Sequence, residues 1–394
     1  MRKFRFLDLL NPSAFFLMFI LFYFILIILL NYITSVNLIK FNIRQETYYV
    51  LYLFFVVFIV SAYIITPSIL GYKPKRASFI IFDLSIKKIN VVVFFLVLFG
   101  WGIHLFYFFK IGFIPSFHAN VSLVRISAKA GFGGGLLLAN GALYAAIILL
   151  SYKYYLANYT NKISTLLVLI MSTLIISGVG FRGPAAYLVL IFSLSTFFLS
   201  ISYIKSKKIP KKLIVFCLFF ILFLSVIDYL RYGNEFSLSS FLQLFWTMTV
   251  NLYNLNNIVD GILTDKLTYL WGESFLTDIA VAIPGMDSQF LGVTLVSQLG
   301  LSFEGEGMTV TAPGEAFINF GYLGVVIYAF LLGFVCEVLF QMLTTKNKAS
   351  SILILSFFSL SFAKVVIAGL TPTLVFTLVP VLLFLIPSII WCKK

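Results

Sequence analysis

Apolar runs of about 20 residues recur from the first residues of the chain to the last, and this feature limits the possible fold more than any other. A helix needs roughly 20 apolar residues to cross about 30 Å of hydrocarbon. Apolar residues make up 61% of the 394 residues and charged residues only 11%, whereas soluble domains carry about 25% charged residues. The sequence therefore predicts an all-α, polytopic integral membrane protein, with one transmembrane domain over residues 1–394.

About ten transmembrane helices are predicted from the positions of these runs. They lie near residues 14–34, 48–70, 89–109, 133–152, 163–181, 184–204, 212–229, 316–340, 350–369 and 372–391. An even number of spans places both termini on the same side of the membrane.

The basic residues indicate which side that is. If both termini are cytoplasmic, the cytoplasmic side holds 19 of the 28 Lys and Arg residues, the other side holds 8, and Lys364 lies within the ninth span. This distribution follows the positive-inside rule. The net charge of +14 is therefore interpreted as a topology signal with a share in binding anionic membrane lipids, and no nucleic-acid partner is expected.

The sequence contains no pattern that predicts a cofactor or a metal site. There is no His/Cys metal cluster, nucleotide P-loop or dinucleotide fingerprint. The acidic pair Glu304 and Glu306 is interpreted as a solvated loop turn, with binding of a divalent ion as the weaker alternative. Cys217, Cys336 and Cys392 fall inside spans or at their cytoplasmic ends, so no disulfide is expected.

Two long segments on the side away from the cytoplasm interrupt the pattern of short connections, and long connections are usually functional or disordered. They cover residues 110–135 and 230–314, and the interior of the second holds 8 of the 14 acidic residues. Within it, residues 236–262 carry apolar groups at helical spacing and predict an amphipathic helix in the interface plane. We expect the functional groups on this side of the membrane.

Three arginines, Arg125, Arg182 and Arg231, lie at this membrane edge. An arginine costs roughly 2.5–3.5 kcal/mol at the centre of a membrane helix, and its guanidinium binds phosphate oxygens in a bidentate manner. Arg182 precedes Gly183, which permits close approach, and Pro184, which suits a first helical turn. The pattern indicates a site for an anion such as a pyrophosphate, with snorkelling of the arginines to lipid phosphates as the open alternative.

The possible acid–base groups are few. His104 falls within a span, where a core hydrogen bond is expected, whereas His118 lies in the first long segment and is a candidate base. Glu315 begins the eighth span, where the helix dipole alone would favour a carboxylate. Asp228 lies three residues before Arg231, so it is either a base beside the anion site or the ion-pair partner of that arginine.

The candidate site residues fall into two groups. The candidate catalytic residues are Arg182, Arg231, Glu315, Asp228 and His118. The candidate substrate-binding residues are Arg125, Lys129, Gly183, Tyr232 and Asn234.

Several segments, taken in order, resemble those of the Wzy-type polymerases, also called O-antigen or oligosaccharide repeat unit polymerases. The resemblance covers roughly residues 90–340. Its motifs are Gly112-Phe113-Ile114-Pro115 with Arg125 downstream, Gly180-Phe181-Arg182-Gly183-Pro184, Leu230-Arg231-Tyr232-Gly233, and Pro313-Gly314-Glu315-Ala316-Phe317-Ile318-Asn319-Phe320-Gly321-Tyr322-Leu323-Gly324.

This resemblance implies a glycosyltransferase of the bacterial inner membrane. It would join oligosaccharide repeat units carried on undecaprenyl pyrophosphate into O-antigen or capsular chains on the periplasmic side. It implies no nucleotide-sugar donor, and a chain-length regulator as a possible partner protein. An O-antigen ligase, a flippase or transporter for the same lipid-linked oligosaccharide, and a scaffold protein remain alternatives.

Overall fold

The computed structural model describes residues 11–21, 24, 43–71, 81–118, 132–156, 159–180, 182–204, 238–283, 289–301, 307–345 and 348–394. Within these ranges nearly every residue is helical, and β-structure is limited to two isolated bridges. The predicted all-α class is therefore confirmed.

The helices of the first half of the chain are α1 (Pro12–Ile20), α3 (Gln45–Ile59), the π-helical η3 (Val60–Ile65), α4 (Thr66–Leu70), α5 (Ile86–Ile111), the 3-10 helix η4 (Pro115–Phe117), α7 (Gly133–Leu156), α8 (Tyr159–Gly178) and α9 (Arg182–Ile204). Those of the second half are α11 (Leu238–Leu263), α12 (Glu273–Ala282), α13 (Leu291–Gln298), α14 (Ala312–Thr344), α15 (Ala349–Ala368), α16 (Leu370–Thr373), the π-helical η5 (Leu374–Leu378) and α17 (Val379–Cys392).

Seven of the described helical segments are long and apolar enough to cross a membrane. They are Gln45–Leu70, Ile86–Ile111, Gly133–Leu156, Gly183–Ser200, Ala312–Thr344, Ala349–Ala368 and Leu370–Cys392, and each covers one predicted span to within a few residues. A shorter apolar helix, Lys162–Gly178, lies over the predicted span 163–181. The span 212–229 and most of the span 14–34 lie outside the described residues, so the polytopic class is confirmed while the total of ten stays a prediction.

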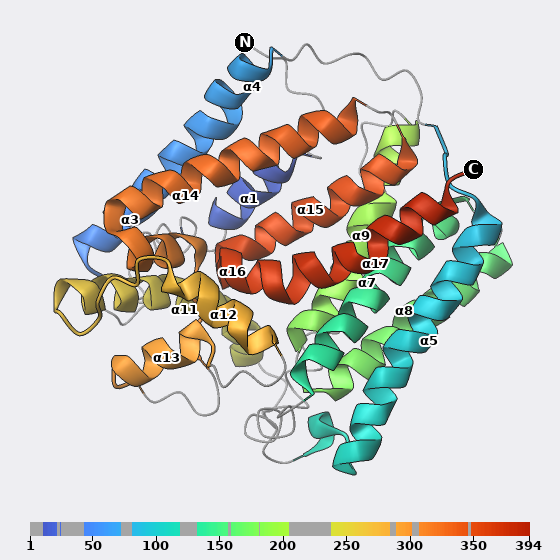
Figure 1. Cartoon of the computed structure of the whole chain (residues 1–394), viewed down its shortest axis with the longest axis horizontal. Coiled ribbons are helices and arrows are strands. Elements are labelled where there is room, and N and C mark those ends of the chain that lie inside the picture. The colour runs from blue at the N-terminus through green and yellow to red at the C-terminus, as the bar shows by residue number, and fades with distance from the viewer. Residues whose placement is uncertain are drawn as a thin grey trace.

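The helices run between two ends of the molecule (Figure 1). The start of α5 lies beside the C-terminus, where the Ser85 N–H donates to the carbonyl oxygen of Cys392 at 2.8 Å. A β-bridge between Ile81 and Lys348 places the start of α15 at the same end. The opposite end holds the end of α5 and the first turns of α9, α14 and α16, and we call it the distal end.

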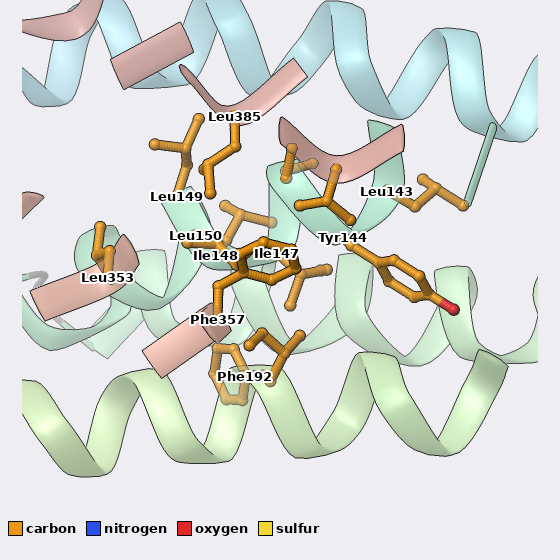
Figure 2. Packing of buried hydrophobic residues seen from close by; sticks show 14 of the residues in the cluster. Leu143, Tyr144, Ile147, Ile148, Leu149, Leu150, Phe192, Leu353, Phe357 and Leu385 are labelled. Atoms are coloured by element: carbon orange, nitrogen blue, oxygen red, sulfur yellow. The ribbon is translucent and has the colours of Figure 1, made fainter. Parts of the chain in front are cut away.

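Helix α7 forms the centre of one of the two large cores. Its residues from Gly141 to Tyr152 are all buried, as expected for a helix that is covered on every side. Leu149 of α7, Leu385 of α17, Phe357 of α15 and Phe192 of α9 all belong to this buried cluster (Figure 2). The other core joins α1, α3, α11, α13 and α14, and α15 contributes residues to both. Helix α15 therefore lies between the two cores and packs in both.

The predicted helix over residues 236–262 is present as α11. On its second half, Leu252, Leu255 and Val259 are fully buried at helical spacing within the core that includes α14. Its orientation relative to the membrane plane stays a prediction.

The residues expected to be structural are found in the interior. His104 is fully buried, and its Nδ1 lies 2.7 Å from the carbonyl oxygen of Gly100, which matches the expected core hydrogen bond. Cys336 and Cys392 are buried free thiols, and Cys217 lies outside the described residues.

Candidate functional site

The segment after α5 makes a tight turn at the distal end. Gly112 ends α5 with φ of +78°, a backbone conformation that glycine adopts without strain. Pro115 then opens η4, since its fixed φ suits a first helical position. His118 follows η4 as an exposed residue, and its ring centroid lies 5.6 Å from that of Phe113. The motif therefore ends in an accessible imidazole.

The turn between α8 and α9 carries the second motif. Gly180 has φ of +93°, α9 begins at Arg182, and Pro184 lies in its first turn as predicted. Gly183 is exposed, and a Cβ placed on it would meet no atom of the described chain within 4 Å. Among the described residues, none covers the backbone at Gly183. The side chain of Arg182 lies outside the described part of the structure.

The segment after α5 contacts the end of α8, just before the second motif, although 61 residues separate the bonded pair along the chain. The Ser116 hydroxyl donates a hydrogen bond to the carbonyl oxygen of Ser177. A Cβ on Gly178 would lie 2.8 Å from the Phe108 ring and 3.3 Å from Ile114, so glycine lets the end of α8 pack closely against α5 and the residue before η4. The fold thus holds the end of η4 next to the turn that leads into Arg182.

A second group of polar residues surrounds the start of α14. The helix is capped by the hydroxyl oxygen of Thr311, which accepts a hydrogen bond from the N–H of Gly314 at 3.3 Å. Pro313 occupies its first turn, where the missing N–H has no cost. This start places Glu315 inside the molecule, at the turn between α15 and α16.

The Glu315 carboxylate is fully buried and is bonded by the chain itself. It accepts hydrogen bonds from the backbone N–H of Leu370 and from both the N–H and the hydroxyl of Thr371. Gly369 between α15 and α16 has φ of +90°, and a Cβ there would lie 2.7 Å from Glu315 Oε2. The carboxylate therefore caps α16. The sequence alone suggests only an interaction with the dipole of α14.

Helix α14 breaks one turn after Glu315. Phe320 and Gly321 leave helical geometry, and Gly321 has φ of +59°. The carbonyl oxygens freed by the break accept other donors, since the N–H of Leu270 bonds to Ile318 at 3.0 Å and that of Trp271 bonds to Asn319 at 3.1 Å. The loop before α12 is thereby fixed to α14.

Asn319 organises this junction with its side chain. Its Nδ2 donates to Ser274 Oγ at 2.7 Å, and its Oδ1 accepts from the N–H of Gly272 at 3.0 Å. These bonds hold Trp271, which has φ of +48° and is 72% exposed. A positive φ is rare for a bulky residue and persists only where its surroundings enforce it.

Asp278 of α12 brings a second buried carboxylate to the same junction. It is 1% exposed, and its Oδ1 accepts from the N–H of Leu291 at 3.1 Å. Its Oδ2 has no hydrogen-bond partner among the described residues. Burial raises the pKa of the Asp278 carboxyl above its usual range, although the bond from Leu291 opposes the shift.

The remaining predicted site residues lie outside the described part of the structure. They are Arg125, Lys129, Asp228, Arg231, Tyr232 and Asn234. Glu304 and Glu306 also lie outside it. Among the residues that the structure describes, no group of three or more His, Cys, Asp or Glu side chains is arranged to hold a metal ion.

Sequence reasoning gave no individual role to three of the polar residues at this junction, Asn319, Asp278 and Thr371. Asn319 stands inside an otherwise apolar helix start, where a buried amide requires partners, and that signal was present in the sequence. Asp278 and Thr371 acquire their surroundings only through tertiary contacts.

The fold and the distal end together define a class of protein. The chain is a multi-pass, all-helical membrane protein in which the buried carboxylates Glu315 and Asp278 lie at one junction of the described helices and the first turn of α9 contains the exposed Gly183. The family model described as O-antigen polysaccharide polymerase Wzy matches residues 136–394. The chain therefore belongs to the O-antigen polysaccharide polymerase Wzy family, as the resemblance implied.

The matched residues include the Arg182 turn and the whole junction around Glu315, and they begin after the Gly112–Pro115 motif. Comparison with curated protein sequences and with solved structures gave no match. Membership of this family makes the chain a membrane protein of polysaccharide biosynthesis with a polymerase-type, glycosyl-transferring activity.

Proposed function

We propose that this polymerase joins oligosaccharide repeat units carried on undecaprenyl pyrophosphate, at the periplasmic face of the bacterial inner membrane. The family supports polymerisation. The excess of basic residues on the side of the termini supports cytoplasmic termini, and hence a periplasmic distal end. Residues 110–135 and 230–314 would then form the two periplasmic functional segments around the site.

The observation that carries this proposal is the contact between η4 and the end of α8 at the distal end. Ser116, two residues before His118, bonds to the end of α8, five residues before Arg182. A general base and a cation for an anionic leaving group must lie near the same reacting carbon. The fold gives both residue types neighbouring backbone positions.

The reaction transfers the growing chain to the incoming repeat unit. A hydroxyl oxygen of the incoming lipid-linked repeat unit forms a bond to the anomeric carbon of the growing chain. The bond from that carbon to the pyrophosphate oxygen breaks, and undecaprenyl pyrophosphate leaves with the electron pair. The hydroxyl proton passes to a base on the protein, so atoms and charge balance without a cofactor.

Arg182, Arg231 and Arg125 would stabilise the charge that develops on the pyrophosphate, as positioned donors do in a transition state. His118 or Asp228 would accept the proton. Glu315 enters as a positioning residue, because its carboxylate is already bonded by three donors of the α15–α16 turn. Substrate binding is assigned to Lys129, Gly183, Tyr232 and Asn234, and a chain-length regulator and membrane lipids are the proposed partners.

The proposal is tested with a lipopolysaccharide gel from cells that lack the gene. The deletion is complemented with the wild type, Arg182→Ala, Arg182→Lys or Lys87→Ala at matched membrane abundance. Lys87 is an exposed lysine at the opposite end of the molecule, so its variant is the control for loss of a charge. If the protein is a polymerase with an anion site at Arg182, the deletion strain and the Arg182→Ala strain should show a core that carries a single repeat unit. The strains with the wild type and with Lys87→Ala should show a full ladder.

Arg182→Lys separates charge from geometry, because lysine keeps the charge and loses bidentate binding. We expect a shortened ladder from this variant. A deletion that leaves a core with no repeat unit would indicate a ligase or a flippase instead, and an unchanged ladder in the deletion would contradict all three functions.

A further inference from the structure

Lys364 is a cation inside the helix bundle, close to the distal end. It lies in the last turns of α15, in a segment that qualifies as a membrane span. Its Nζ donates to the Thr377 hydroxyl at 2.7 Å and lies 5.7 Å from the centroid of the Tyr187 ring. An ionisable residue in such a place is costly and usually functional.

No acidic side chain in the described part of the chain forms an ion pair with this lysine. The ion pair between Arg44 and Asp260 is the one salt bridge found among the described residues, and Lys364 takes no part in it. An ammonium group has three N–H donors, and one of them is used by Thr377. The carboxylate of Glu315, a buried acid at the turn that follows α15, accepts hydrogen bonds from Leu370 and Thr371 and not from Lys364.

A chain of contacts connects Lys364 to the open start of α9. The Tyr187 ring lies 5.0 Å from that of Tyr144, whose hydroxyl donates to the carbonyl oxygen of Pro184 at 3.0 Å. Tyr187 follows Arg182 by five residues, which is about 7.5 Å along a helix axis at 1.5 Å per residue. The ring that Lys364 contacts therefore belongs to a residue about one and a half helical turns after Arg182, where α9 packs against α15.

Tyr187 is itself fixed in this position. Its hydroxyl lies 2.8 Å from Ser361 Oγ, one turn before Lys364 on α15. Tyr187 and Thr377 are both buried, whereas Lys364 itself is partly exposed, so its ammonium group is held by fixed neighbours and is not fully enclosed. A positively charged group held in this way, against the helix whose first turn contains the exposed Gly183, matches an anionic group that enters from the distal end.

We propose that Lys364 binds a phosphate of the lipid-linked pyrophosphate, as a second cation beside Arg182. This inference rests on the proposed function, since it names a further residue of the same anion site. Lys364 forms charge-assisted hydrogen bonds to the phosphate from within the bundle, while the start of α9 contacts it from the open side. Its charge stabilises the pyrophosphate both as the bound donor and as the leaving group.

The test measures binding of undecaprenyl pyrophosphate and of undecaprenol to purified full-length protein in nanodiscs. Lys364→Met keeps the length of the side chain without its charge, and Lys364→Arg keeps the charge. Lys348→Met is the matched control, because Lys348 is an exposed lysine just before the opposite end of the same helix. Polymerisation by the same samples is recorded as KM and kcat.

Loss of one charge-assisted hydrogen bond predicts that Lys364→Met weakens binding of undecaprenyl pyrophosphate about 10- to 100-fold. Its binding of undecaprenol should equal that of the wild type, and Lys348→Met should bind both lipids normally. Lys364→Arg should retain binding of the pyrophosphate to within about threefold, since the charge is kept. A merely structural lysine would change the binding of both lipids equally, and that result would overturn the inference.

Two further outcomes separate the inference from the proposed function. Polymerisation and pyrophosphate binding that survive in Lys364→Met would overturn the inference and leave the function intact. A wild type that binds undecaprenyl pyrophosphate through Lys364 and makes no polymer would overturn the function alone. If Lys364→Met fails to accumulate, Thr377→Val is tested instead, because it removes the hydroxyl oxygen that orients the ammonium group of Lys364. Unchanged affinity of Thr377→Val for undecaprenyl pyrophosphate would count against the inference.

Discussion

Glu315 and Thr371 join the first turn of α14 to the turn between α15 and α16. The carboxylate of Glu315 accepts hydrogen bonds from the backbone N–H and from the hydroxyl of Thr371. Both residues are buried, so water cannot replace these bonds. The pair therefore fixes the end of α15, where Lys364 lies, relative to the junction of α12 with α14.

We expect Glu315→Gln to lower the stability of the protein by roughly 1–3 kcal/mol, because the amide presents an N–H₂ group to donors and leaves a buried donor unsatisfied. Thr371→Val removes the hydroxyl group that donates a hydrogen bond to the Glu315 carboxylate, and it should also lower stability. The double variant should lose less than the sum of the two single losses, since they share one interaction. Thermal unfolding in detergent measures all three, with Glu273→Gln as an exposed control. Fully additive losses would show that the two side chains do not act together.

Asp278 should make stability depend on pH. Its pKa is raised by burial, so the folded protein binds the proton more tightly than the unfolded chain does, and stability falls as pH rises through the raised pKa. Asp278→Asn removes the ionisable group and should therefore raise Tm at neutral pH. The difference from the wild type should shrink as pH falls towards 4, about the ordinary pKa of an aspartate. A difference that is constant with pH, or that grows in acid, would contradict burial as the cause.

Gly321 should not tolerate a side chain. It has φ of +59° at the break of α14, and a Cβ there would lie 3.2 Å from the hydroxyl oxygen of Tyr269. We expect Gly321→Ala to destabilise the protein by about 1 kcal/mol or more. Gly102→Ala is the matched control, because Gly102 lies inside α5 with no atom of the described chain within 4 Å of its Cβ position. Equal Tm values for the two variants would mean that the break does not require glycine.

The helices could be predicted from sequence because membrane spans are set by a local quantity, the length of an apolar run. The predicted span 89–109 appears as Ile86–Ile111, and the span 350–369 as Ala349–Ala368. The break at Phe320 and Gly321 was not predicted, since no proline marks it and apolar residues continue through it. It depends on carbonyl oxygens that bond to the loop before α12, a contact across nearly 50 residues.

The candidate site was accessible to sequence reasoning where a motif has its own backbone signature. Glycines with positive φ begin both distal motifs, at Gly112 and Gly180, and Pro184 occupies the first turn of α9. The partners of Glu315 were not predictable, because Leu370 and Thr371 are ordinary residues until the fold brings them to the carboxylate. Roles for Arg125, Arg231 and Asp228 stay predictions.

Polymerisation from a lipid-linked donor is tested most directly with purified protein in nanodiscs and one defined repeat unit on undecaprenyl pyrophosphate, without nucleotide sugars. We predict a ladder of products that differ by one repeat unit, formed by the wild type and by Lys348→Met, and at least 100-fold slower formation by Arg182→Ala, the typical size of losing one transition-state donor. If the wild type forms no ladder, and instead transfers a single unit to lipid A core when that acceptor is added, the proposed polymerase function is wrong.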